Sequence, residues 1–80
     1  MRAQLYFSLL KLADGGVVLV NEIRGYKFWS ELTNWLRENG IKYKVSAIGR
    51  GMRVEYRYKV DGRCLNRLNK ILAACSPDVE

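Results

Sequence analysis

Histidine is absent from this sequence of 80 residues, and cysteine occurs only as Cys64 and Cys75. Without histidine or a CxxC pair, the usual zinc ligand sets and a Ser-His or Cys-His nucleophile cannot be assembled. The two cysteines stand eleven residues apart in one expected helix. At about 1.5 Å per residue that separation is far beyond the reach of a disulfide. We expect two buried thiols and a reducing, cytoplasmic location.

Proline occurs once, and no apolar run approaches the roughly 18 residues of a membrane-spanning helix. The hydrophobic fraction of 49% is typical of a folded globule. We therefore expect one domain over residues 1–80 and no membrane association. The segment "MRAQLYFSLLKLADGG" has a lysine and an aspartate where a signal peptide has its small-residue cleavage site, so we expect it to belong to the fold.

The segment "YKFWSELTNWLRENGI" is the clearest helix in the sequence. Its apolar side chains recur at helical spacing, at Phe28, Leu32, Trp35 and Leu36. Asn39-Gly40 is typical of a helix end, with the glycine in the left-handed conformation and Ile41 packing back. Trp35 is expected in the core, and Trp29 is the better candidate for an exposed anchor, because tryptophan is enriched at interface hot spots.

A β-hairpin is predicted over residues 41–60, because apolar and charged side chains alternate on both sides of a "GRG" turn. The expected inner set is Ile41, Tyr43, Val45, Ala47, Met52, Val54, Tyr56, Tyr58 and Val60. The expected outer set is Lys42, Lys44, Ser46, Arg53, Glu55, Arg57 and Lys59. The segment "DGRCLNRLNKILAACSP" is a second helix, with Asp61 as its N-cap and Pro77 past its end. The tail "SPDVE" is expected to fray.

Residues 3–13 fit two structures. Leu5, Leu9 and Leu12 stack at helical spacing, whereas Leu5, Phe7 and Leu9 equally form one side of a strand. The following "VVLVNEI" is a strand by composition. The chain is therefore ββαββα, which is slightly favoured, or αβαββα if residues 3–13 are helical. Both are α+β folds with helices covering one side of a mostly antiparallel sheet.

Positive charge is concentrated in one part of the chain. Residues 40–70 hold nine of the fourteen lysines and arginines and two acids, a net charge of +7, whereas the remainder carries −1. Such asymmetry indicates a polyanionic partner. A two-stranded ribbon fits the major groove of duplex DNA. The residues expected to contact nucleic acid are Lys42, Lys44, Arg50, Arg53, Arg57, Lys59, Arg63 and Arg67.

Nucleic acid is one of several partners that the basic hairpin could serve. A solvent-exposed sheet surface carries charged side chains in any protein, so the basic face alone does not require a nucleic-acid partner. This protein could instead be an inhibitor or adaptor, including a phage-encoded one, whose basic face binds an acidic protein. Tyrosines on the inner side of the hairpin favour duplex over single-stranded nucleic acid. A nucleic-acid binder should keep Glu55 away from the contact, whereas a protein partner could use it as a salt-bridge acceptor. A third possibility is a homo-oligomer formed through an exposed edge strand.

The segment "LLKLADGGVVLV" resembles the LAGLIDADG motif of homing endonucleases, through Leu10, Ala13, Asp14 and Gly15. The order of a strand, a helix ending in "WLRENGI", a basic hairpin and a closing helix "GRCLNRLNKIL" is also similar to that family. The resemblance implies one αβαββα half that dimerises and lays an antiparallel sheet over the DNA major groove. It also implies a Mg²⁺-dependent DNA endonuclease in which Asp14 binds the metal.

The residues alone predict less at this position. Asp-Gly and Gly-Gly are common turn sequences, so Asp14-Gly15-Gly16 is expected to form a turn, and one carboxylate is a small basis for a metal site. From the residues we therefore expect no catalytic constellation and no cofactor. A strand at residues 3–13 would contradict the family resemblance.

Overall fold

The computed structural model describes residues 1–21, 26–51 and 54–78. The order of elements is αβαββα: α1 (Ala3–Ala13), β1 (Val18–Asn21), α2 (Tyr26–Glu38), β2 (Tyr43–Ile48), β3 (Glu55–Val60) and α3 (Leu65–Ala73), with the short 3₁₀ helix η2 (Gly62–Cys64) before α3. The three strands form an antiparallel sheet in the order β1-β3-β2. The expected α+β class is confirmed, and β3 is the central strand.

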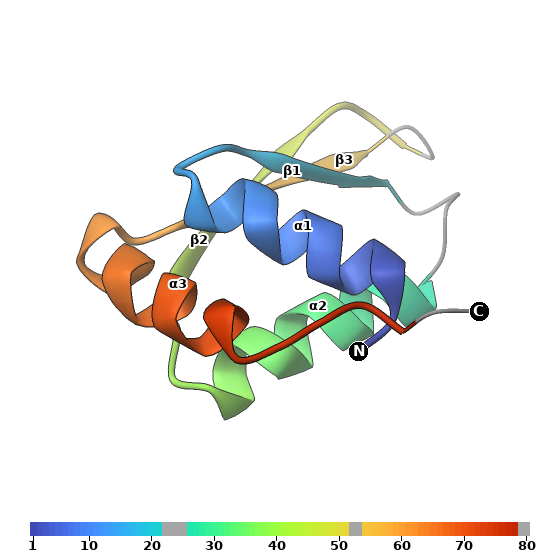
Figure 1. Ribbon diagram of the computed structural model, residues 1–80. Coiled ribbons are helices and arrows are strands. Elements are labelled where there is room, and N and C mark those ends of the chain that lie inside the picture. Colours follow the sequence, from blue (N-terminus) through green and yellow to red (C-terminus); the bar gives the residue numbers. More distant parts are fainter. Residues whose placement is uncertain (22–25, 52–53, 79–80) are drawn as a thin grey trace.

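The slightly favoured strand at residues 3–13 is wrong, because this segment is the helix α1. A strand with Leu5, Phe7 and Leu9 on one side would bury all three. Instead, Leu5 and Leu9 are buried while Phe7 is 60% exposed. The buried set continues at Leu12, one further helical step along. A three-stranded sheet needs cover on its apolar side, and α1 supplies part of it beside α3 (Figure 1).

Glycine ends α1 and α2 in the same way. Gly15 has a φ of 81°, and the Gly16 N–H donates to the carbonyl of Lys11 at 2.9 Å. At the end of α2, Gly40 has a φ of 67°, and the Ile41 N–H donates to the carbonyl of Leu36 at 2.9 Å. These are Schellman bonds, which satisfy carbonyls left free at a helix end. The predicted stop at Gly40 is confirmed, and Ile41 is buried.

The core lies between the sheet and the three helices. Its fully buried side chains come from every layer: Leu9, Leu12, Leu32, Leu36, Tyr58 and Leu68. Tyr58 also stacks on Tyr43, with ring centroids 5.6 Å apart, and its hydroxyl lies 3.0 Å from the Thr33 hydroxyl. This buried hydrogen bond joins α2 to the central strand, and burial raises the pKa of Tyr58.

Two expectations about side-chain exposure are wrong. Trp29 is half-buried and packs against the core, as Trp35 does, so it is not an exposed anchor. The cysteines are free but only half-buried, because η2 interrupts the expected long helix and Cys75 follows the end of α3. Asp61 is a cap as predicted, but of η2: its carboxylate accepts the Arg63 N–H at 3.0 Å.

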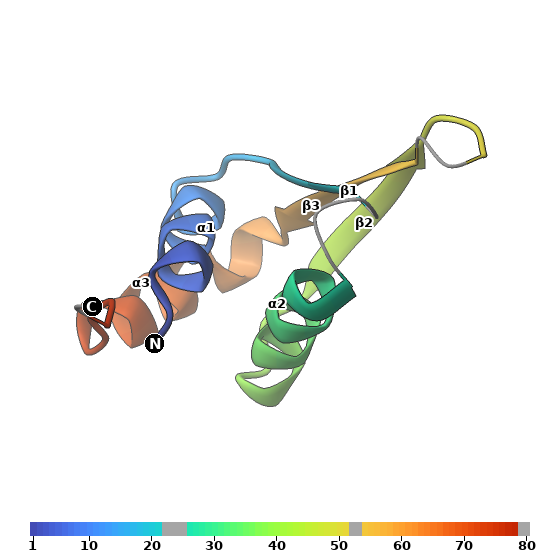
Figure 2. The same cartoon turned by 90° about the vertical axis from the view of Figure 1, so that its right-hand side faces the viewer.

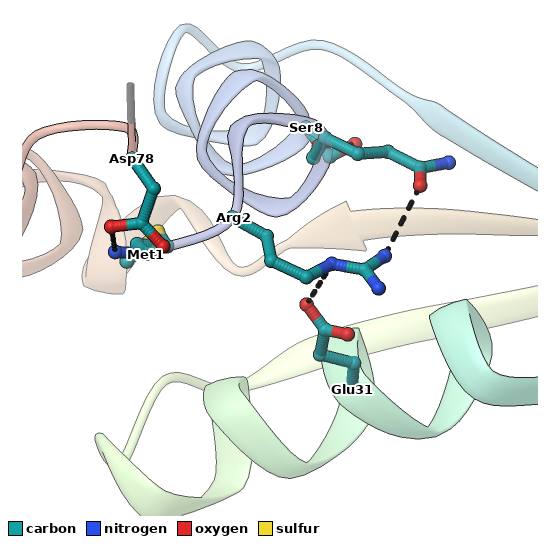
Figure 3. Close-up of polar contacts among 6 residues, drawn as sticks. Met1, Arg2, Ser8, Glu31 and Asp78 are labelled. Atoms are coloured by element: carbon teal, nitrogen blue, oxygen red, sulfur yellow. Dashed lines mark hydrogen bonds and ion pairs between the residues drawn. The ribbon is translucent and has the colours of Figure 1, made fainter. Parts of the chain in front are cut away.

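The two ends of the described chain lie side by side, which contradicts the expected fraying as far as Asp78 (Figure 3). The Met1 ammonium lies 2.8 Å from Asp78 Oδ1, and the Asp78 N–H donates to the carbonyl of Met1 at 2.6 Å. Beside them, Arg2 Nε lies 3.3 Å from Glu31 Oε1, which joins the start of α1 to α2. The last two residues lie outside the described chain.

Candidate nucleic-acid interface

The side of the sheet that faces away from the helices carries the candidate interface, and we call it the outer face. In β2 and β3 the residue pairs on this side are Lys44 with Lys59, Ser46 with Arg57, and Ile48 with Glu55. From β1, Leu19 pairs with Arg57 on the same side. All these side chains are exposed, whereas Val18, Val20, Tyr58 and Val60 on the helix side are buried. The predicted alternation is therefore confirmed in the burial of β3, whereas the residues of β2 on the helix side, Val45 and Ala47, are exposed.

Arg57 occupies the centre of the outer face. It belongs to the middle strand, with Leu19 on one neighbour and Ser46 on the other. Lys59 follows two residues later, so it projects from the same side next to Lys44. Within the described chain none of these three cations has an ion-pair partner. We call these three residues, Lys44, Arg57 and Lys59, the basic cluster.

Other predicted contact residues lie around this cluster. Lys42 precedes β2, and its carbonyl accepts the Asp61 N–H at 2.9 Å, so it extends the ladder past Lys44. Arg50 is exposed in the turn at the hairpin tip, and Arg53 lies outside the described residues. Arg63 is exposed in η2, next to the base of the hairpin.

Arg67 occupies a different position. A Cβ placed on Gly40 would lie 3.4 Å from Arg67 Nη2, so this guanidinium covers the turn between α2 and β2. That turn belongs to the helical layer. The structure therefore brings Lys44, Arg57 and Lys59 together and sets Arg67 apart from them.

Glu55 shares the outer face with the basic cluster. It lies two residues before Arg57 on β3 and pairs with Ile48, toward the hairpin tip. Lys59 lies at the opposite end of the same strand. An approaching polyanion would therefore meet the lysine end of β3 more favourably than the glutamate end.

The outer half of the hairpin projects beyond the helices, as Figure 2 shows. Val45 lies on the helix side of the sheet and is nevertheless 43% exposed, and Ala47 is exposed as well. Tyr43, Tyr56 and Tyr58 also lie on this side, Tyr58 buried and the other two half-buried. The described outer face thus offers no aromatic ring on which an unpaired base could stack.

Asp14 is exposed at the C-terminal end of α1, where the chain turns toward β1. The turn expected from Asp-Gly-Gly is present, as a helix end followed by a strand. Within the described part of the chain, no group of three or more potential metal ligands comes together. Among the described residues Asp14 is therefore not part of a metal-ligand set.

A second exposed surface runs along the sheet edge formed by β1. Its apolar members are Phe7, Val17 and Leu19, and we call it the edge surface. A shallow groove of about 390 Å³ lies between α1 and β1, lined by Phe7, Leu19 and Lys11 among others. No local sequence pattern indicates this surface, because it depends on β1 lying at the edge of the sheet.

The helices of the described residues are all too short or too polar to cross a bilayer. No protein-family model matches the chain, and comparisons with curated proteins and with solved structures find no match.

Proposed function

We propose that this protein binds nucleic acid, with duplex DNA favoured, through the outer face of its sheet. The observation that carries the proposal is the strand register, which sets Lys44, Arg57 and Lys59 side by side with no acidic partner in the described chain. Clustered like charges repel one another, and a polyanion that neutralises them relieves that repulsion. Phosphate contacts by these side chains would dominate the affinity and make it depend on salt.

Two features support a duplex as the partner. The hairpin, with β1 beside β3, projects beyond the helices, so this end of the sheet can approach a major groove about 12 Å wide without a clash from the helical layer (Figure 2). The described outer face combines the basic cluster with Ser46, Glu55 and the apolar Leu19 and Ile48, and it has no aromatic platform, unlike a typical single-strand binder.

The resemblance to LAGLIDADG homing endonucleases remains part of the proposal. Its support is the order αβαββα and a first helix that ends at Asp14-Gly15, directly before a strand. Leu9 stands where the family motif has a glycine, but it is buried in this chain's own core, and Phe7 and Leu10 point outward in its place. If the chain is such a half, Asp14 from two copies would hold the Mg²⁺, and DNA cleavage that requires Mg²⁺ would show it.

The direct test is fluorescence anisotropy with a labelled duplex, single-stranded DNA and RNA over a salt series. We expect the duplex to bind most tightly, with a logarithmic salt slope of about −3 if three phosphates are neutralised. Absence of binding to all three probes at low salt would reject the proposal. The basic cluster would then belong to an acidic protein partner, as an inhibitor or adaptor would require.

Glu55→Gln separates these two partners by the sign of its effect. Because Glu55 shares the outer face with Arg57, its charge repels phosphate. Removing that charge should tighten duplex binding about 2- to 5-fold, the usual range for a charge at the rim of an interface. A protein partner that uses Glu55 as a salt-bridge acceptor would instead bind more weakly. Glu38→Gln, on an exposed position of α2, is the matched control and should change neither affinity.

The edge surface supports a second proposal, that two copies of the chain associate through it. Edge strands are normally protected by charge, whereas Leu19 on β1 and Val17 just before it are apolar and exposed. On α1, Phe7 lines the groove beside Leu19, and residues 1–20 hold two basic side chains and one acidic one, a net charge of +1 in a protein of +6. Two copies that meet here therefore avoid the strong repulsion of residues 40–70, which carry +7.

Leu19→Lys should break such a dimer. Sedimentation equilibrium of the original protein should give a concentration-dependent mass approaching twice 9.3 kDa. The variant should remain a monomer, because the lysines of the two copies would face each other across the new edge. Ile48→Lys, which changes an exposed apolar residue on the opposite edge strand, is the control. A monomer at all concentrations in the original protein would contradict the dimer without touching the nucleic-acid proposal.

A further inference from the structure

Lys44 and Lys59 stand directly opposite each other on neighbouring strands. Directly opposed residues of an antiparallel pair have Cα atoms roughly 4.5 to 5.5 Å apart, and like charges at such positions destabilise a sheet. Both side chains are exposed, and neither has an ion-pair partner in the described chain. The pair is therefore a local electrostatic cost, and no ion pair within the described residues offsets it.

A hollow of about 210 Å³ opens next to this pair, lined by Lys44, Lys59, Val60, Asp61 and Gly62. It is several times the ~30 Å³ that one water molecule occupies in the liquid, so a tetrahedral phosphate group fits into it. At Gly62 the hollow opens to free space, since a Cβ placed there would meet no atom within 4 Å. The Asp61 carboxylate is engaged by the Arg63 N–H at 3.0 Å, in its role as a cap.

We infer that this hollow is a phosphate seat, in which one backbone phosphate of the bound nucleic acid bridges the Lys44 and Lys59 ammonium groups. The seat rests on the proposed function and adds to it the position of one phosphate. A single anion between two opposed cations removes the repulsion at that position and forms charge-assisted hydrogen bonds to both. Because Lys44 and Lys59 lie at the base of the hairpin, the seated phosphate sets how far the hairpin arm enters the groove.

The salt dependence of paired variants tests the phosphate seat. The salt slope falls by about 0.9 for each phosphate that the protein no longer neutralises. Lys44→Met/Lys59→Met removes two charges but, if both hold one phosphate, should reduce the slope by about 0.9. Lys44→Met/Arg57→Met removes the same charge and should also reduce it by about 0.9, because Lys59 still holds the shared phosphate and only the phosphate at Arg57 is lost. Equal reductions near 1.8 in both double variants would overturn the seat while leaving nucleic-acid binding in place.

Gly62→Glu tests the phosphate seat by placing a negative charge in the hollow. No backbone strain is expected at this position, and a carboxylate there would compete with the phosphate for the two lysines. We expect duplex affinity to fall at least about 10-fold, against a loss under about 3-fold for Gly62→Gln, which has the same size and no charge. Equal effects of the two variants would contradict a phosphate seat.

If the protein does not bind duplex DNA, the phosphate seat can be tested with a small anion. Pyrophosphate titrated into the protein should shift the backbone amide signals of Lys44, Lys59 and Gly62 in two-dimensional NMR spectra more than those of Lys27 and Lys70. Shifts confined to the hollow would support an anion seat without nucleic acid. Uniform or absent shifts would reject it.

Discussion

Tyr58→Ala should lower the free energy of unfolding by about 3 to 5 kcal/mol. Tyr58 is 1% exposed, lies on the central strand and stacks on Tyr43. Replacing a buried aromatic residue by alanine costs about 3 to 5 kcal/mol, because apolar burial is lost and a cavity remains. A domain of 80 residues has a total stability of roughly 4 to 12 kcal/mol, so this loss is a large fraction of it. Urea unfolding followed by circular dichroism measures the change.

Tyr58→Phe isolates the buried hydroxyl pair. The ring stays, but the Thr33 hydroxyl loses its partner 3.0 Å away, which should cost about 1 to 3 kcal/mol. Thr33→Val/Tyr58→Phe removes both hydroxyls and should be more stable than the sum of the two single variants predicts. Strict additivity in this cycle would mean that the hydrogen bond contributes nothing.

The same residue predicts a dependence on alkaline pH. Burial raises the pKa of Tyr58 above its usual 10.0, so the folded protein keeps this proton where the unfolded chain has released it. The unfolded state then binds fewer protons, and stability must fall as pH rises above about 10. Below about pH 10, ionisation of Tyr58 should not affect the free energy of unfolding. Tyr58→Phe should show a shallower decline above about pH 10 than the original protein, and Tyr6→Phe, which removes a hydroxyl that does not act on Tyr58, is the control.

Local patterns predicted the parts of the fold that are decided locally. The stripe Phe28, Leu32 and Leu36 has one periodicity, so α2 was clear, and the alternation in residues 41–60 determined which hairpin residues face the helices. In residues 3–13 leucines satisfy both periods at once. The decision there comes from tertiary packing, because the sheet needs a helix beside α3 to cover its apolar side.

The candidate interface was likewise predictable only where it depends on local sequence. Alternation placed Lys44, Arg57 and Lys59 on one side, but no local pattern shows that β1 crosses to pair with β3 and sets Leu19 beside Arg57. The hollow at Gly62 depends on how η2 leaves the sheet, and the position of Arg67 depends on α3 packing near Gly40. Charge runs in sequence therefore locate a basic face, while its edges are set by long-range contacts.

Arg57→Glu should weaken duplex binding about 30- to 100-fold at moderate salt. Arg57 lies at the centre of the outer face, between Leu19 and Ser46, and its guanidinium can reach a phosphate or a guanine edge. Loss of a hydrogen bond to a charged group costs roughly 1.5 to 3 kcal/mol, and the new carboxylate adds repulsion. About 1.4 kcal/mol corresponds to a tenfold change in the dissociation constant, which gives the expected range.

Lys27→Glu is the matched control for Arg57→Glu. It makes the same change in net charge on the exposed first turn of α2, where the helix dipole favours an acid, so folding should be preserved. A long-range effect of net charge alone would weaken binding equally in both variants. Binding through the outer face would leave Lys27→Glu within about 3-fold of the original protein, because exposed charges beyond roughly 10 Å are screened at about 0.1 M salt. Equal losses of affinity in both variants would mean that binding does not depend on the outer face. Unchanged affinity in Arg57→Glu would mean that the centre of the outer face does not contact the duplex.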